Sequence, residues 1–117
     1  VEQCPFLADE SNVKKIKAAK DIIIQRIAEP PTLVELSSEI DLSLKKLKEG
    51  FKQIYGTTVY GFLFDYKMEL ARKLLESGAH NVNEVGLKVG YSTASHFIAA
   101  FKKHYGTTPK KYIQSSN

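Results

Sequence analysis

Apolar residues recur every three or four positions along most of the chain, which is the spacing of a helix that buries one face. The first stripe begins after Ser11 and ends at Pro30-Pro31, because proline cannot continue a helix. Its members are Val13, Ile16, Ala19, Ile23 and Ile27. No segment alternates apolar and polar residues as a half-buried strand does. The pattern predicts an all-α fold of about seven helices.

Two capped helices are predicted next. Thr32, with Glu35 three residues later, forms a capping box that opens a short helix. After a tight turn at Asp41-Leu42, Ser43 caps a longer helix, which Gly56 is placed to end in a left-handed conformation. The inward residues are Leu33, Leu36 and Ile40 in the short helix and Leu44, Leu47, Phe51 and Ile54 in the longer one.

A fourth helix is predicted from Thr58 to about Ser77, where Ser77-Gly78 stops it. At 1.5 Å per residue it would be about 27–30 Å long. Its apolar face consists of Val59, Phe62, Leu63, Tyr66, Leu70, Leu74 and Leu75. We expect this helix to connect the segments on either side of it.

The chain then repeats itself. Phe51-Lys52-Gln53-Ile54-Tyr55-Gly56-Thr57-Thr58 returns fifty residues later as Phe101-Lys102-Lys103-His104-Tyr105-Gly106-Thr107-Thr108. Upstream, the apolar residues from Leu33 to Ile40 match those from Val82 to Val89 at a distance of 49, because the second copy has one extra residue between Ser92 and Phe101. Such a repeat indicates two copies of one supersecondary unit.

The second copy should therefore contain the same elements. A short helix starts near Asn83, Gly90-Tyr91 makes the turn, and Ser92 caps a sixth helix that Gly106 ends. Thr108 with Pro109 opens a last short helix. The inward residues are Val82, Val85, Val89, Phe97, Phe101 and Tyr105. The expected organisation is a tether over residues 1–10, a first subdomain over 11–57, a connecting helix over 58–77 and a second subdomain over 78–117.

Composition excludes several classes of protein. Of the 117 residues, 43% are hydrophobic and 26% charged, as in a soluble globule, and no apolar run approaches the roughly 20 residues that span a bilayer. The single Cys4 cannot form an internal disulfide, and one cysteine with three scattered histidines gives no metal-ligand spacing. With no nucleophile–base pair and no Gly-rich phosphate loop, we expect no enzyme, cofactor or metal.

The distribution of charge favours a polyanionic partner. The net charge is +4. Residues 85–117 contain five lysines and no carboxylate, whereas residues 1–84 contain 12 basic and 13 acidic side chains. A basic end on a small domain is typical of nucleic-acid binding, although a lysine-rich face can also be merely solvated.

A short helix, a tight turn and a longer capped helix make a helix-turn-helix, and here the arrangement occurs twice. A DNA major groove about 12 Å wide admits one α-helix. Successive major-groove faces on one side of B-DNA lie roughly 34 Å apart. A connecting helix near that length could hold two reading helices one turn apart, so that a single chain reads an asymmetric site.

Over about residues 12–114, the sequence resembles the DNA-binding domain of the AraC/XylS family of bacterial transcription regulators. The most specific residues are those of the second copy, Val82-Asn83-Glu84-Val85, Val89-Gly90-Tyr91-Ser92, His96-Phe97, Phe101-Lys102-Lys103, Tyr105-Gly106-Thr107-Thr108-Pro109 and Tyr112. The stretch from Cys4-Pro5-Phe6 to Lys14-Lys15-Ile16 is similar to the interdomain linker of siderophore-responsive members.

The resemblance implies sequence-specific binding of double-stranded DNA by two recognition helices in successive major grooves. It implies a bacterial, cytoplasmic and nucleoid-associated regulator that acts as an activator and contacts RNA polymerase. A ligand-sensing and dimerisation part would precede Val1, so we expect this chain to be a monomeric fragment of a full-length protein that could be dimeric. The alternative is a helical protein–protein interaction module without DNA binding, whose lysines serve solubility.

Three features depart from the family pattern. Gly86 replaces the usual alanine, which would loosen its helix by up to ~1 kcal/mol. Ile113 stands where arginine often follows the closing tyrosine. Glu49 and Ala99 occupy recognition-helix positions where many members have arginine, so base preference cannot be carried over from relatives.

Candidate DNA contacts lie on the outward faces of the third and sixth helices and at the basic C-terminal end. Lysines suit phosphate or guanine, Glu49 can accept a hydrogen bond from cytosine, and Ala99 can approach a thymine methyl. The base-reading candidates are Lys45, Lys48, Glu49, Ser95 and Ala99. The backbone candidates are Ser43, Lys46, Lys52, Ser92, Lys102, Lys103, Thr108, Lys110 and Lys111. By their spacing, the aromatic residues Phe51, Phe62, Phe97, Phe101 and Tyr112 are expected in the core rather than on a base-stacking platform.

Overall fold

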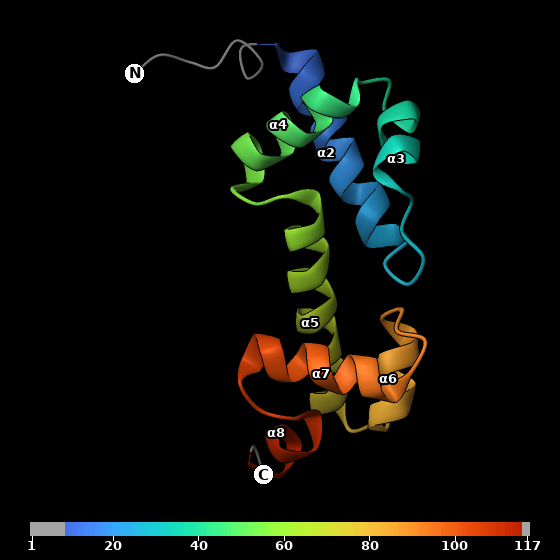
Figure 1. Ribbon diagram of the computed structural model, residues 1–117, viewed down its shortest axis with the longest axis vertical. Helices are drawn as coiled ribbons and strands as arrows, with labels where there is room; N and C mark the ends of the chain where they lie inside the picture. Colours follow the sequence, from blue (N-terminus) through green and yellow to red (C-terminus); the bar gives the residue numbers. More distant parts are fainter. Residues whose placement is uncertain (1–8, 116–117) are drawn as a thin grey trace. The chain divides into compact units, whose positions relative to one another are not determined.

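The computed structural model describes residues 9–115 (Figure 1). Within this range it contains seven helices and no strand, which confirms the all-α prediction. The predicted tether and the Cys4-Pro5-Phe6 stretch lie largely or wholly outside the described residues. The chain divides into two compact units, unit 1 ending at Leu63 and unit 2 beginning at Phe64.

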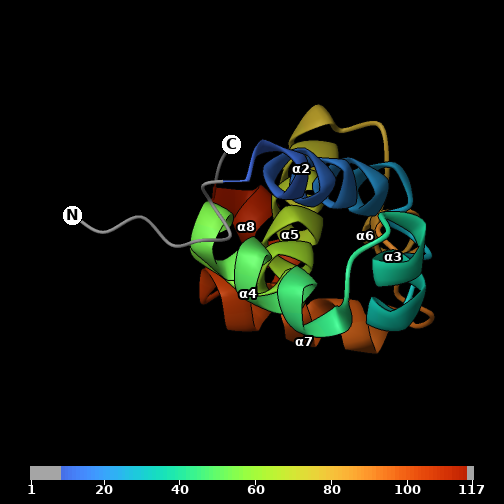
Figure 2. The ribbon, with the colours of Figure 1, turned by 90° about the horizontal axis from the view of Figure 1, so that it is seen from above.

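Unit 1 is built around α4. It comprises α2 (Glu10–Gln25), α3 (Leu33–Glu39), α4 (Leu44–Tyr55) and the start of α5 (Val59–Ser77). Helix α4 packs against both α2 and α3 (Figures 1 and 2). The buried core consists of Ile16, Ala19, Ile23, Leu36, Ile40, Leu47, Phe51 and Val59. These are mostly the inward residues of the predicted stripes, so the helical period placed this core correctly.

Unit 2 repeats the plan around α7. It comprises the rest of α5 with α6 (Val82–Lys88), α7 (Ala94–Tyr105) and α8 (Pro109–Ser115), and α7 packs against α6 and α8 (Figure 1). The buried core consists of Met68, Ala71, Leu75, Val85, Val89, Phe97 and Phe101. Phe62 and Tyr112 are half-buried against the cores of unit 1 and unit 2. The prediction that the aromatic residues are core is therefore confirmed.

Local hydrogen bonds explain where the short helices begin. Thr32 and Glu35 form the expected capping box, with Glu35 N donating to Thr32 Oγ1 at 3.1 Å and Thr32 N donating to Glu35 Oε1 at 2.9 Å. Asn81 and Glu84 form a second capping box at the start of α6, at 2.8 and 3.0 Å. At the other end of the longer helices, Gly56 and Gly106 have φ of 74° and 78°, the predicted left-handed caps.

Helix α2 ends earlier in the sequence than its apolar stripe predicted. It is capped by Asp9 and ends at Gln25, because Arg26 leaves the helical conformation. Glu29 N then donates to Arg26 O at 3.1 Å in a turn. Ile27 therefore lies in the turn that follows the helix.

The cap of α7 was predicted wrongly. Thr93, not Ser92, caps α7, and its hydroxyl accepts a hydrogen bond from His96 N at 3.2 Å. The extra residue of the second copy lies in the turn that precedes α7, so the repeat distance has already become fifty at the cap. Thr93 is consequently the counterpart of Ser43, which caps α4.

Helix α5 buries Val59 and Leu75, as predicted, together with two residues that were not predicted. Met68 and Ala71 are fully buried although neither was expected to be. Phe62 and Leu63 pack on the core of unit 1, whereas the residues from Phe64 onward pack in unit 2. One stripe cannot describe a helix that serves two cores. None of the helices in the described part of the chain is long and apolar enough to cross a membrane.

Candidate nucleic-acid interface

The turn before α4 is held by contacts from two sides. Asp41 is the one residue other than glycine with a positive φ in the described range, at 57°. Leu42 N donates to Ser37 O at 3.0 Å, which closes the turn on α3. Lys15 Nζ of α2 donates to Asp41 O at 3.0 Å and lies 3.9 Å from its carboxylate. These contacts set the angle at which α4 leaves α3.

The turn before α7 is held in a related way. Gly90 has a φ of 101°, and Tyr91 N donates to Gly86 O at 2.9 Å. The ammonium of Lys67 in α5 lies 5.3 Å from the centre of the Tyr91 ring, a cation–π contact. Burial lowers the pKa of Lys67 and raises that of Tyr91. In each unit, therefore, a lysine from the long preceding helix contacts the turn.

The outward face of α4 is strongly basic. Because Leu47, Gly50 and Phe51 face the core, the opposite side presents the exposed residues Lys45, Lys46, Lys48, Glu49 and Lys52. Among the described residues, none of these five side chains has a hydrogen-bond or ion-pair partner. Ser43 differs from them, because its hydroxyl already accepts a hydrogen bond from Lys46 N at 3.2 Å. The face therefore presents four unpaired ammonium groups around one carboxylate.

No residue of this face lines the groove of about 490 Å³ in unit 1, but three of its residues line a second groove of about 430 Å³. The second groove is lined by Leu33, Lys48, Glu49, Lys52, Thr58, Val59 and Tyr60. It brings the first residue of α3 and the start of α5 next to the α4 face. Tyr60, which the sequence did not mark as a site residue, is thereby placed among the candidates.

The outward face of α7 has a different chemistry. Ser95, Ala99, Lys102 and Lys103 are exposed, as predicted for side chains that face away from Phe97 and Phe101. Ile98 takes the place that Lys48 has in α4, fifty residues earlier, and it is half-buried. Ser92 is exposed in the turn. This face has small side chains in its first half and lysines in its second.

The C-terminal lysines form a further basic group, which lies in unit 2 after the lysines of α7. Thr108 Oγ1 accepts a hydrogen bond from Lys111 N at 3.3 Å, and Pro109 is buried, which orients the first turn of α8. Lys110 and Lys111 are exposed. The structure thus brings Thr108, Lys110 and Lys111 together, while it places Lys102 and Lys103 in the last turn of α7.

Several cations outside these faces are neutralised by carboxylates. Arg72 lies 3.0 Å from Glu76 and 3.7 Å from Glu69, and Arg26 lies 3.3 Å from Glu39. Such exposed pairs add little stability. They do, however, leave less positive charge on those surfaces than on the outward face of α4.

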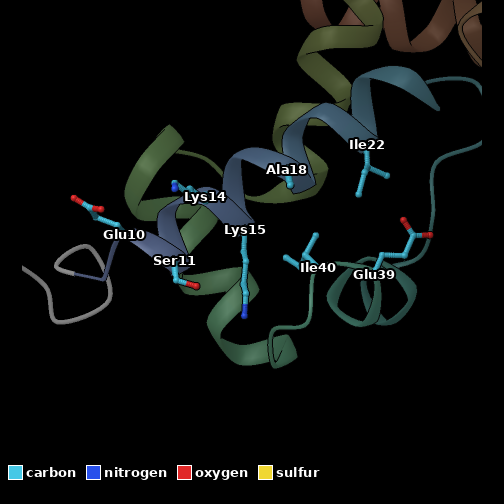
Figure 3. A pocket seen from close by; sticks show the side chains of 8 residues that line it. All are labelled: Glu10, Ser11, Lys14, Lys15, Ala18, Ile22, Glu39 and Ile40. Atoms are coloured by element: carbon cyan, nitrogen blue, oxygen red, sulfur yellow. The ribbon is translucent and has the colours of Figure 1, made fainter.

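The larger groove of unit 1 has mixed charge. Its lining comes from α2 and the end of α3 and consists of Glu10, Ser11, Lys14, Lys15, Ala18, Ile22, Glu39 and Ile40 (Figure 3). It has as many carboxylates as ammonium groups, and Lys15 is already engaged with Asp41. The groove therefore does not favour a polyanion. No group of three potential metal ligands occurs among residues 9–115.

Comparison with known proteins identifies the family. Residues 36–115 match the family described as "Helix-turn-helix domain". Over 72 residues the chain is 39% identical to the regulatory protein PchR of Pseudomonas aeruginosa, an alignment that covers 62% of this chain and 24% of PchR. The chain belongs to the AraC/XylS family of helix-turn-helix domains. It spans only about a quarter of the length of PchR.

Two further comparisons cover most of the chain. The transcriptional regulator SirC of Salmonella typhimurium is 31% identical over 114 residues, which are 96% of this chain and 38% of SirC. The DNA-binding domain of AdpA, a global transcriptional factor solved in complex with a target DNA, has the same fold, with a TM-score of 0.79 at 18% identity over 86% of this chain and 91% of that one.

Proposed function

We propose that this chain binds double-stranded DNA sequence-specifically, with α4 and α7 as its recognition helices, as the DNA-binding part of a bacterial transcription regulator. The observation that carries the proposal is the outward face of α4. It is the second helix of a helix-turn-helix, and its four exposed lysines have no partner among the described residues. A helix of this kind suits the major groove, and its free ammonium groups suit the phosphates beside it.

The same features disfavour the alternative of a protein–protein interaction module. Of the four lysines of α2, Lys15 and Lys20 each lie 3.9 Å from a carboxylate, whereas all four lysines of α4 are exposed without a partner among the described residues, which favours a polyanion as the partner of α4. In the proposed assignment, Lys45, Lys48, Glu49, Ser95 and Ala99 read bases. Lys46, Lys52, Lys102, Lys103, Lys110 and Lys111 contact phosphates, with Ser43, Ser92 and Thr108 beside the backbone.

The wider role of the regulator follows from its family. We propose that residues 11–57 and 78–117 are the two DNA-reading subdomains, joined by residues 58–77. The complete regulator would act without enzymatic chemistry in the bacterial cytoplasm, at the nucleoid. There it would activate transcription through contact with RNA polymerase.

Selection of bound duplexes from a random pool tests DNA reading directly. We expect an enriched asymmetric motif, whose affinity falls steeply with salt because bound phosphates release counterions. Charge reversal of Lys45 and Lys48 to glutamate should abolish enrichment. The same reversal at Lys14 and Lys17, which are exposed lysines of α2, should leave the enrichment unchanged. A pool that shows no enrichment with the unmodified chain would exclude sequence-specific binding.

A further inference from the structure

Tyr60 is a large side chain that the fold leaves in solvent. It is the second residue of α5 and is 63% exposed, whereas its neighbour Val59 is only 7% exposed. It lies on the groove of about 430 Å³ that also includes Lys48 and Lys52 of α4. An exposed aromatic ring in a groove beside a basic helix face is available to a ligand rather than to the core.

The groove combines an apolar lining with a charged rim. Leu33, Val59 and the Tyr60 ring supply apolar surface. Lys48 and Lys52 supply two ammonium groups, and Glu49 supplies the one carboxylate among the lining residues. A sugar–phosphate backbone has matching parts, since its deoxyribose is largely apolar and its phosphate is anionic. The Glu49 carboxylate repels phosphate, so the anion is expected at the two lysines and the Tyr60 hydroxyl.

The internal repeat gives an independent reason to single out this position. Thr58 and Thr108 each accept a hydrogen bond from the backbone N–H three residues later, at 3.0 and 3.3 Å. The residues that follow them, Val59 and Pro109, are both buried. The next position is exposed in both copies and holds Tyr60 in unit 1 and Lys110 in unit 2. Equivalent backbones thus present a phenol in one unit and an ammonium group in the other, and both can donate to a phosphate oxygen.

We propose that the groove beside α4 receives the sugar–phosphate backbone of one DNA strand and that Tyr60 is a DNA-contacting residue. Its ring packs on deoxyribose together with the half-buried Leu33, and its hydroxyl donates to a phosphate oxygen. The inference rests on the proposed function, because it assumes that α4 enters the major groove. It adds an uncharged contact that positions α4 without reading bases.

Two substitutions separate the hydroxyl from the ring. Tyr60→Phe should weaken binding to both the selected duplex and a random duplex by about 10- to 100-fold, the effect of one hydrogen bond to a charged group. Tyr60→Ala should weaken both further because the packing is lost as well. Sequence preference should stay the same. The slope of log K against log salt should also stay the same, since no cation is removed, whereas Lys52→Ala should lower it by about one.

Chemical substitution of the DNA locates the contact. Single phosphates are replaced by neutral methylphosphonates. At one position the replacement should weaken binding of the unmodified chain but should not weaken binding of Tyr60→Phe, which already lacks the hydrogen bond. Leu87→Ala is the matched control, because Leu87 is 64% exposed on α6 and lies outside the groove. Thermal unfolding of each variant verifies that it is folded.

The possible outcomes distinguish this inference from the proposed function. If the unmodified chain binds no duplex, the proposed function itself fails. If it binds but Tyr60→Ala behaves like Leu87→Ala, the groove does not hold the DNA backbone and is left to another occupant, such as a peptide or a small molecule. A change in base preference in Tyr60→Phe would also overturn the proposal, because it would make Tyr60 a reader of bases.

Discussion

Glu49 is a carboxylate among lysines on the outward face of α4, and it has no partner among the described residues. A negative charge in that place weakens attraction to phosphate unless it accepts a specific hydrogen bond. Cytosine N4 is a suitable donor in the major groove. We therefore expect this residue to lower general affinity for DNA and to raise discrimination between sites.

Replacing Glu49 with alanine should separate these two effects. We expect non-specific binding to be equal or tighter, while preference at one or two base pairs relaxes by about 1–3 kcal/mol. Selection with the variant, compared with the unmodified chain, measures both. Glu29→Ala, at an exposed carboxylate in the turn after α2, is the control and should change neither. An unchanged preference after Glu49→Ala would rule out base reading by this side chain.

Lys102 and Lys110 are expected to position the domain rather than to read sequence. Both are exposed, and neither has a partner among residues 9–115. Lys102→Ala or Lys110→Ala should weaken specific and non-specific binding about equally and reduce the salt slope by roughly one unit each. Isotherms at several salt concentrations measure the slope, with Lys17→Ala on α2 as the control. A loss confined to the specific site would contradict a phosphate contact.

At the scale of elements, Gly86 explains how α6 and α7 approach each other. A Cβ at this position would lie 3.1 Å from Phe97 Cβ and 3.2 Å from its ring. The corresponding residue of unit 1 is Ser37, also buried, whose hydroxyl donates to Val34 O at 2.8 Å. From sequence, Gly86 indicated only a weaker helix. In the structure it is the residue that leaves room for the Phe97 ring.

Gly86→Val should therefore overpack the interface between α6 and α7. We expect the free energy of unfolding to fall by about 1–3 kcal/mol. Urea unfolding measures it, and because valine has a higher helix propensity than glycine, a loss of stability cannot come from propensity. A Gly86→Val variant at least as stable as the unmodified chain would mean that Phe97 moves aside without cost.

The capping box of α3 makes the stability of unit 1 depend on pH. The pKa of Glu35 is held below its ordinary value of 4.5 by hydrogen bonds with the backbone and side chain of Thr32. Because the folded pKa is the lower one, the stabilisation is present above about pH 4.5 and is lost as the pH falls through the folded pKa. Glu35→Gln should lower the melting temperature at pH 7, and the difference from the unmodified chain should shrink below pH 4.5. Melting curves over this range test it, and a constant difference would contradict it.

At the scale of the whole molecule, the two copies have diverged where they would contact DNA. Lys45, Lys48 and Glu49 of α4 correspond to Ser95, Ile98 and Ala99 of α7, fifty residues later. Two unlike faces on one chain cannot read the two halves of a palindrome equally. A single chain therefore has the means to recognise an asymmetric site.

We expect one chain to bind one duplex and to protect an asymmetric site of about two helical turns. Footprinting gives the length and symmetry of the site, and sedimentation of the complex gives the number of chains. Reversing one half of the selected site relative to the other should abolish tight binding. A strictly palindromic footprint that only a dimer occupies would contradict this expectation.

The sequence by itself determined the class of fold, the repeat and most helix ends. Capping boxes such as Thr32 with Glu35, and left-handed glycines such as Gly56, act over three or four residues. The helix ends that they set can therefore be predicted without a structure. The same holds for the outward faces of α4 and α7, because each helix packs on one side only. The family resemblance rests on these same local residues.

Tertiary structure decided what depends on residues far apart in the chain. It buried Met68 and Ala71 because α5 serves two cores. It also placed Tyr60 in a groove with Lys48, which no local pattern indicates. Helix period and capping report only short-range hydrogen bonds and one-sided burial, whereas which side of a shared helix is buried, and what borders a groove, depends on packing between separate segments.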